Sequence, residues 1–219
     1  KLTAAPRQQP SHRARRRRTA PDLQPGNATT MSTGTADSPP PPGSARHAAW
    51  LYTAAGLRQP LAALFAVERA IGESSRGDLA HEVAHARLQW WQHECQQLAR
   101  GCGMHPLSRQ LQSHAAAVHQ APPDLQTWVT AVGEQLARVA WLDRAEFAAH
   151  CQRWTESVWL GAAALLAPAA ASPQALAPLL GVGNALRELE LLSRLASDAR
   201  AGQVNLPLDE LQRCKVATS

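Results

Sequence analysis

Residues 183–212 carry the clearest helical pattern in the chain. Leucines recur there about every third residue, and Glu190, Arg194 and Asp198 stand four residues apart among them. Apolar residues at this spacing form a stripe on one face of an α-helix, and charged residues one turn apart can form ion pairs on another face. Gly202 is placed to end the helix. The stretch predicts a long amphipathic helix that packs on a core through its leucines, which are Leu186, Leu189, Leu191, Leu192 and Leu195.

The rest of the chain favours the same secondary structure. Alanine and leucine dominate, whereas the 219 residues include only one tyrosine and two phenylalanines. From residue 48 onward apolar residues recur at helical spacing, and prolines and glycines separate the stretches. A chain of this length with 45% hydrophobic residues can bury one sizeable core. We expect an all-α protein, a single-domain bundle of six or seven helices.

The first part of the chain has a different composition. It lacks apolar periodicity, is rich in proline, arginine, serine and threonine, and includes RARRRR at residues 13–18 and a run of four prolines. Such a segment cannot bury enough apolar surface to order itself. We expect a disordered tail at residues 1–46 and a helical domain at residues 47–219. Met31 opens an alternative start that would leave residues 1–30 upstream of the protein; a nucleic-acid-binding arm and an organelle transit segment are the other readings.

The positive charge of the chain is confined to this tail. The formal net charge is +5, and the first thirty residues alone contribute +6, with seven basic residues and one acidic residue. The remaining 189 residues hold 15 basic and 16 acidic side chains. A domain without an excess of positive charge lacks the electrostatic footprint of a nucleic-acid-binding protein. We therefore expect no nucleic-acid partner for the helical domain.

Cysteine spacing and hydropathy bear on the compartment. The four cysteines form no CxxC pair, and no apolar signal segment precedes them. The longest apolar run, residues 158–171, contains a proline and is shorter than the ~20 residues that span a bilayer. We expect a cytoplasmic protein with reduced thiols and no transmembrane helix, whose contact with membranes is peripheral at most.

The sequence HEVAH matches the HExxH motif of zinc proteases. The motif supplies two histidines one turn apart as zinc ligands and a glutamate as general base, which here are His81, Glu82 and His85. A catalytic zinc needs a third protein ligand, and the extended motif would place a histidine where this chain has Trp91. A zinc hydrolase on these three residues is therefore only the third of our functional hypotheses.

Five segments between residues 50 and 211 resemble helices of the squalene/phytoene synthase family, in the same order and at similar spacing. They are ALFAVERAIGESSR, ARLQWW, HPLSRQL, EFAAHCQRWTESVWLGAAALL and DARAGQVNLPLDEL. The resemblance implies a bundle of the isoprenoid synthase type. It also implies two aspartate-rich helices that face each other across a cavity and hold Mg²⁺ ions, which neutralise the diphosphates of two prenyl substrates joined head to head. Family members usually continue further, so we expect a domain shortened at its C-terminus.

The chain departs from the family at both aspartate-rich positions. At most one carboxylate, Glu73, remains in the first helix, and in the last helix Asp198 is retained while Arg194 replaces an aspartate. A guanidinium cannot ligate Mg²⁺ and competes with it for the same carboxylates. The resemblance thus implies a vestigial pocket whose charges pair along each helix, with Arg69, Glu73 and Arg76 on one helix and Glu190, Arg194 and Asp198 on the other.

Two further hypotheses rank above the zinc hydrolase. The first is a degenerate family member without a cofactor, which binds an isoprenoid or lipid or acts with a protein partner as an assembly factor. The string AVERAIGES is similar to a branch of the family that has lost its aspartates and serves in assembly of respiratory complex I.

The second hypothesis is an active Mg²⁺-dependent prenyl transferase that uses Glu73, Glu190 and Asp198 as a reduced metal site. A plainer reading treats both charged sets as solvated helix faces.

Overall fold

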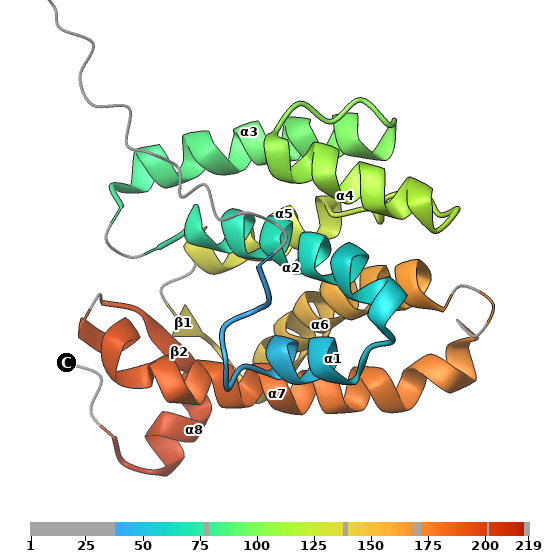
Figure 1. Ribbon diagram of the computed structural model, residues 1–219. Coiled ribbons are helices and arrows are strands. Elements are labelled where there is room, and N and C mark those ends of the chain that lie inside the picture. The colour runs from blue at the N-terminus through green and yellow to red at the C-terminus, as the bar shows by residue number, and fades with distance from the viewer. Residues whose placement is uncertain are drawn as a thin grey trace, which may run out of the picture. The chain divides into compact units, whose positions relative to one another are not determined.

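The computed structural model describes residues 38–216, with gaps at 77–78, 138–139, 168, 170–171 and 201. In this part of the chain, α-helices and two short strands form the domain (Figure 1). The all-α class is confirmed, whereas Met31 and the tail up to residue 37 lie outside the described residues. The helices are α1 (Ala45–Tyr52), α2 (Arg58–Glu73), α3 (His81–Ala99), α4 (Pro106–Ala117), α5 (Gln126–Ala137), α6 (Arg144–Leu166), α7 (Pro173–Arg200) and α8 (Leu208–Arg213), with a 3₁₀ turn, η1 (Ala55–Leu57), before α2.

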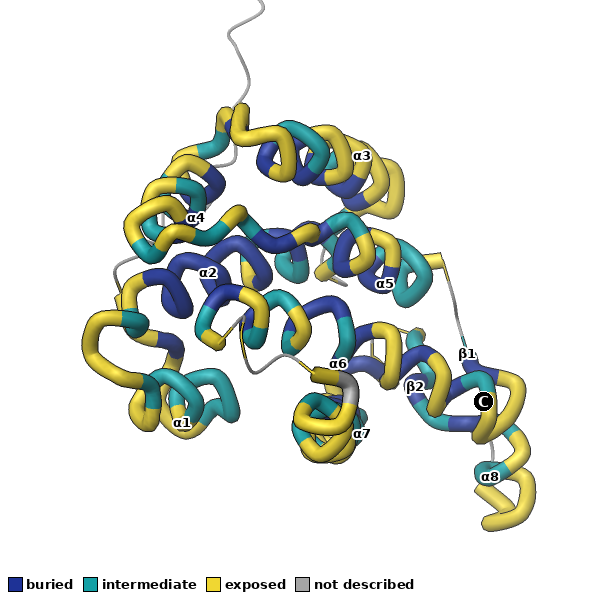
Figure 2. Tube along the Cα trace, turned by 90° about the vertical axis from the view of Figure 1, so that its right-hand side faces the viewer, coloured by how far each residue is buried: buried dark blue, intermediate teal, exposed yellow. Residues whose placement is uncertain are grey.

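Helix α2 is the centre of the bundle. Pro60 stands in its first turn, where the N–H that proline lacks would have no partner within the helix, and residues 60–67 are all buried. A helix that is apolar on every side must be covered on every side. The helices α3 and α4 lie on one side of α2 and α5, and α6 and α7 lie on the other (Figures 1 and 2). The tryptophans Trp91 and Trp128 are fully buried in the core between them.

Helix α7 packs on α6 through a different face from the one that the leucine spacing predicted. Leu191 is buried in a small cluster with Trp141, Phe147 and Cys151, whereas Leu189 is 60% and Leu192 51% exposed. A strict three-residue repeat turns around a helix of 3.6 residues per turn, so the leucines cannot all stay on one face. The predicted leucine stripe is therefore wrong, although the long helix exists and begins earlier than residue 183.

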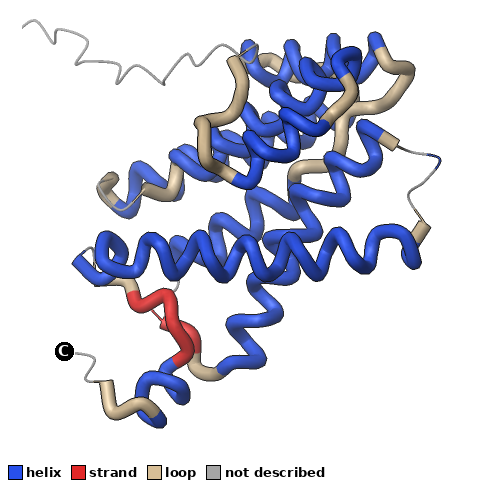
Figure 3. Tube along the Cα trace, turned by 60° about the horizontal axis from the view of Figure 1, so that its bottom comes forward, coloured by secondary structure: helices blue, strands red, loops and turns tan. Residues whose placement is uncertain are grey.

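Two strands, which the sequence analysis did not predict, hold the chain beyond α7. The strands β1 (Ala140–Trp141) and β2 (Val204–Pro207) pair in parallel, with Ala140 opposite Val204 and an irregularity before Trp141 meets Pro207. Strands of this length are too short to show a period of two in the sequence. The pair lies beside one end of α7 (Figure 3), and it brings Asn205 to that helix.

The first helix begins two residues before residue 47, at Ala45. Ser44 caps α1, since its side-chain oxygen accepts a hydrogen bond from the backbone N–H of His47 at 3.1 Å. The cap places Arg46 inside α1 rather than in the tail.

Within the described residues, no helix has the length and apolar character needed to cross a membrane.

Candidate functional site

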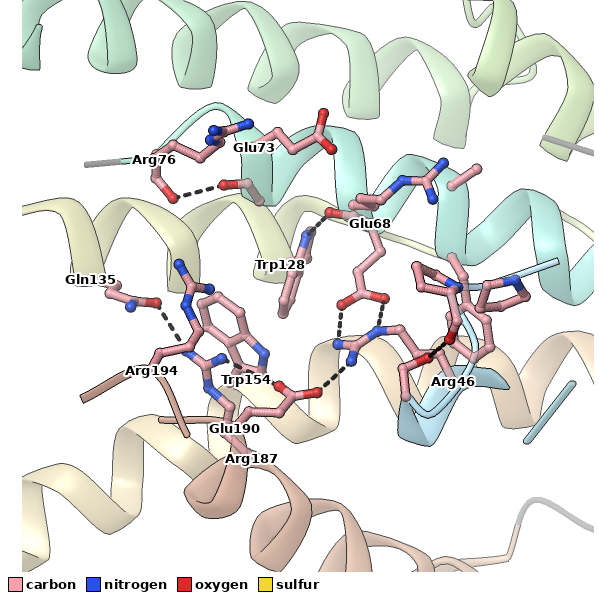
Figure 4. A pocket seen from close by; sticks show the side chains of 18 of the residues that line it. Arg46, Glu68, Glu73, Arg76, Trp128, Gln135, Trp154, Arg187, Glu190 and Arg194 are labelled. Carbon is pink, nitrogen blue, oxygen red and sulfur yellow. Dashed lines mark hydrogen bonds and ion pairs between the residues drawn. The ribbon is translucent and has the colours of Figure 1, made fainter. Parts of the chain in front are cut away.

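A cavity of about 800 Å³ lies between α2, α5, α6 and α7 and is bordered by residues from the segment that enters α1. All six residues that were predicted to form a vestigial pocket line this cavity, although they come from two distant parts of the chain; they are Arg69, Glu73, Arg76, Glu190, Arg194 and Asp198. In the view of Figure 4, Arg76 and Arg194 lie at one end of the labelled group, Arg46 lies at the other, and Trp128 and Trp154 lie between them.

The strongest contact in the cavity joins three helices through Arg46. Its Nε donates to Glu68 Oε2 at 2.6 Å, its Nη2 donates to the other oxygen of Glu68, and its Nη1 donates to Glu190 Oε1 at 2.6 Å (Figure 4). Burial disfavours the charged guanidinium, but the two carboxylates outweigh it and raise the pKa of Arg46 above its ordinary value. One side chain from α1 thereby ties α2 to α7.

This contact was not predicted from the sequence. Arg46 was assigned to the tail, and Glu68 was not among the predicted site residues. A signal for Glu68 was nevertheless present, since it sits within the apolar string ALFAVERAI, and a carboxylate on a buried face needs a counter-charge. Nothing in the local pattern identified the partner, because Arg46 and Glu190 are both distant from Glu68 in the sequence.

Glu190 is also approached by Arg187, which is buried in the cavity wall. The Arg187 guanidinium lies 3.4 Å from the centre of the Trp154 ring, its Nη2 donates to Gln135 Oε1 at 2.9 Å, and its Nη1 is 3.5 Å from Glu190 Oε2. Burial lowers the pKa of Arg187 to about 10, against the opposing effect of Glu190. Its Nε has no hydrogen-bond partner among the described residues.

The charge ladder predicted along α7 is only partly present. Glu190 turns toward Arg46 and Arg187 and forms no ion pair with Arg194, which is 62% exposed. Arg194 Nε lies 3.9 Å from Asp198 Oδ1, at the limit of an ion pair. The firm partner of Asp198 is Asn205, whose Nδ2 donates to Asp198 Oδ2 at 2.7 Å. Glu190 and Asp198 therefore have their main contacts with residues outside the predicted ladder rather than with Arg194, one turn away on the same helix.

The set predicted on α2 is not joined as a ladder either. Arg69 and Glu73 are one turn apart and both line the cavity, but no ion pair joins them. Glu73 has no ion-pair partner within the described part of the chain, which leaves its half-buried carboxylate facing the cavity. Arg76 is exposed and borders the same cavity, but it follows the end of α2 rather than lying on the helix as predicted.

These carboxylates do not make a donor set that suits Mg²⁺. The ion needs several oxygens in octahedral geometry, free of competing cations. The oxygens of Glu68 and Glu190 already accept from Arg46, and Asp198 accepts from Asn205. Among the described residues, no group of three or more histidine, cysteine, aspartate and glutamate side chains is placed to hold a metal ion. A guanidinium stands where the carboxylates of α2 and α7 meet.

The HEVAH residues lie elsewhere. His81, Glu82 and His85 are exposed in the first turns of α3, outside the residues that line the cavity. The Nε2 atoms of the two imidazoles are 3.0 Å apart and share a hydrogen bond. No third ligand joins them within the described ranges, so the geometry gives the zinc hydrolase hypothesis no support.

Comparison with known proteins assigns the chain to a family. No match was found among curated proteins or among solved structures. The sequence model of squalene/phytoene synthase matches residues 41–219, which includes both helices that carry the predicted pocket and the segment that carries Arg46. The matched range is most of the chain and agrees with the five resembling segments. The chain belongs to the squalene/phytoene synthase family.

Proposed function

We propose that this chain binds an isoprenoid or another lipid with an anionic head group in the cavity and does not carry out the metal-dependent condensation of its family. The observation that supports this most is the engagement of the cavity carboxylates by the chain's own cation and amide donors, above all the contact of Arg46 with Glu68 and Glu190. Such a protein would act by holding a ligand, or through a protein partner in an assembly role, rather than by chemistry.

The charge balance of the cavity supports an anionic ligand. Six arginines and four carboxylates are among the described residues that line it, a net charge of +2. Arg69, Arg194 and Arg200 are exposed at its border and form no strong ion pair with any described residue, so their guanidinium groups are available to a phosphate or carboxylate. An anion bound there requires no metal ion to neutralise it.

The remaining wall supports an apolar tail on that ligand. Phe65, Leu136, Trp128 and Trp154 line the same cavity, and its volume lies within the ~300 to 1,000 Å³ typical of sites for small molecules. An aromatic and aliphatic floor beside a group of arginines suits an amphipathic molecule better than a sugar or a free nucleotide. The combination favours a prenyl chain or acyl chain that ends in phosphate or diphosphate.

Calorimetric titration of the purified chain tests the binding. Farnesyl diphosphate should bind without Mg²⁺, whereas farnesol and inorganic diphosphate, which each lack one half of the ligand, should bind at least tenfold more weakly. Arg194→Ala should lower the affinity for farnesyl diphosphate severalfold, because it removes one charge-assisted contact with the diphosphate. Arg153→Ala, which removes an exposed arginine of α6 that pairs with Glu134, is the matched control. Equal affinity for farnesol, or no binding of any prenyl or acyl phosphate, would count against the proposal.

An active prenyl transferase is the second candidate, because Glu73, Glu190 and Asp198 do line one cavity. Incubation with farnesyl or geranylgeranyl diphosphate and Mg²⁺, followed by assay of released diphosphate, separates the two. Our proposal expects no release above the uncatalysed background. Turnover near 1 s⁻¹ or faster, a rate on the order of ordinary enzymes, that is lost in Asp198→Ala would establish the transferase instead.

A further inference from the structure

We propose that Glu68 and Glu190 form a cation-binding site inside the cavity, and that the chain fills this site with its own Arg46. The proposal concerns the groups that hold the cavity together and does not depend on which ligand the cavity binds. It follows from one geometric fact, namely that carboxylates from α2 and α7 both accept hydrogen bonds from a single guanidinium that α1 supplies.

Glu68 makes a cation necessary. Its side chain is 5% exposed, and among the described residues its carboxylate has Arg46 as its one hydrogen-bonding partner. A buried carboxylate without a counter-charge is strongly unfavourable. The backbone of Glu68 is also fixed, since its carbonyl oxygen accepts from Trp128 Nε1 at 3.2 Å. The carboxylate is therefore held toward the cavity and cannot readily withdraw.

Arg187 cannot take over this role. Its guanidinium is stacked on Trp154 and bonded to Gln135, and it reaches Glu190 on the oxygen that Arg46 does not use. The two arginines thus flank Glu190, and only Arg46 extends to Glu68. Removing the Arg46 side chain would leave one buried carboxylate and one half-buried carboxylate facing a common space with no cation between them.

The position of Arg46 explains how α1 is held. Helix α1 has no buried residue, and the side-chain bonds of Ser44 and His47 stay within its own segment, to Pro41 and Pro40. Ala49 and Trp50 pack on the core only in part. Arg58 of α2 also holds the far end of α1, since its guanidinium donates to the carbonyl oxygens of Leu51 and Thr53. The bonds of Arg46 to Glu68 and Glu190 attach the first turn of α1, an attachment that a mobile ion could not provide.

The test is to remove the guanidinium and supply a different cation. We expect Arg46→Ala in the full chain to lower the Tm by several degrees. Millimolar Ca²⁺ or Mn²⁺ should then raise the Tm of this variant in proportion to the logarithm of the cation concentration, because Glu68 and Glu190, no longer paired with a guanidinium, come together to bind the ion only in the folded state. The Tm of the wild type and of the surface control Arg153→Ala should not show this rise.

Two further variants make the outcome decisive. Arg46→Ala combined with Glu190→Gln should lose the cation-dependent rise, since one of the two ligands is gone. Arg46→Gln keeps hydrogen-bond donors without the charge, and it serves as the reporter if Arg46→Ala does not fold. A cation-dependent rise in Arg46→Gln supports the proposal. No rise in any folded Arg46 variant, an equal rise in the wild type, or a rise that survives Glu190→Gln overturns it.

Discussion

Asn205 and Asp198 are joined by a hydrogen bond of 2.7 Å between Nδ2 and Oδ2, and both side chains are buried. The bond fastens β2 to the last turns of α7 and fixes the carboxylate that the family pattern retains. The same bond occupies Oδ2 of Asp198, a carboxylate that one of the sequence-based hypotheses assigned to a metal site. Asp198 is thus oriented by the chain that follows its helix rather than by its neighbour Arg194.

Asn205→Ala should lower the free energy of unfolding by about 1 to 3 kcal/mol, because it leaves a buried carboxylate oxygen without its donor. Chemical denaturation with circular dichroism measures the change. Gln212→Ala, on the exposed face of α8, is the control and should change stability by less than ~0.5 kcal/mol. Equal losses in the two variants would show that the Asn205 bond contributes nothing specific.

Gly183→Ala should destabilise the packing of α7 on α6. A Cβ at Gly183 would overlap Thr155 Cγ2 and would lie 2.9 Å from Trp159 Cδ1, so these side chains or the two helices would have to shift. Overpacking of this kind costs about 1 to 3 kcal/mol. Gly181 lies in the same helix, and no described atom is within 4 Å of a Cβ built there. Gly181→Ala should therefore raise stability by a fraction of the ~1 kcal/mol difference in helix propensity. Opposite signs for the two variants in denaturant unfolding are the expected result.

Arg187→Ala should be more damaging than the loss of any surface arginine. It removes the stack on Trp154 and the bond to Gln135. We expect a loss of about 2 to 4 kcal/mol. Arg144→Ala breaks an exposed ion pair with Glu188 and should cost less than ~1 kcal/mol. Thermal unfolding of the two variants side by side measures the difference, and a similar Tm for both would contradict the structural role of Arg187.

The helical class was predicted from composition and periodicity, which survive in a single chain. That the two distant charged sets share a cavity was implied by the family resemblance alone, and the residues of both sets do line one cavity. The pairing that these charges form was not predicted. Helical spacing predicted an ion pair between Glu190 and Arg194. In the folded structure Glu190 instead pairs with Arg46 and Arg187. Contacts between residues far apart in sequence have no local signal, apart from an apolar segment that contains an unexplained charge, as Glu68 is within α2.

The leucines of α7 show the same limit. Their spacing indicated a helix correctly, but which of them is buried depends on where α6 and the strand β1 lie, and Leu191 is the one buried with Trp141 and Phe147. The strands themselves are held by a parallel pairing across the chain rather than by their own composition. Local periodicity therefore identified the elements, and long-range packing decided which faces and charges meet.

His105 should make the stability of the α3–α4 connection depend on pH. Its Nδ1 accepts from the N–H of Leu107, a role open only to the neutral ring, and burial lowers the pKa of His105 against the opposing effect of Glu94. A lowered folded pKa means that this contribution is complete above the unfolded pKa of ~6.5 and is lost as pH falls below it. His105→Asn keeps a capping acceptor that does not titrate, so its loss of stability between pH 7.5 and pH 5 should be smaller than that of the wild type. His93→Asn, at an exposed position of α3, should follow the wild type; an unchanged pH profile in His105→Asn would contradict the assignment.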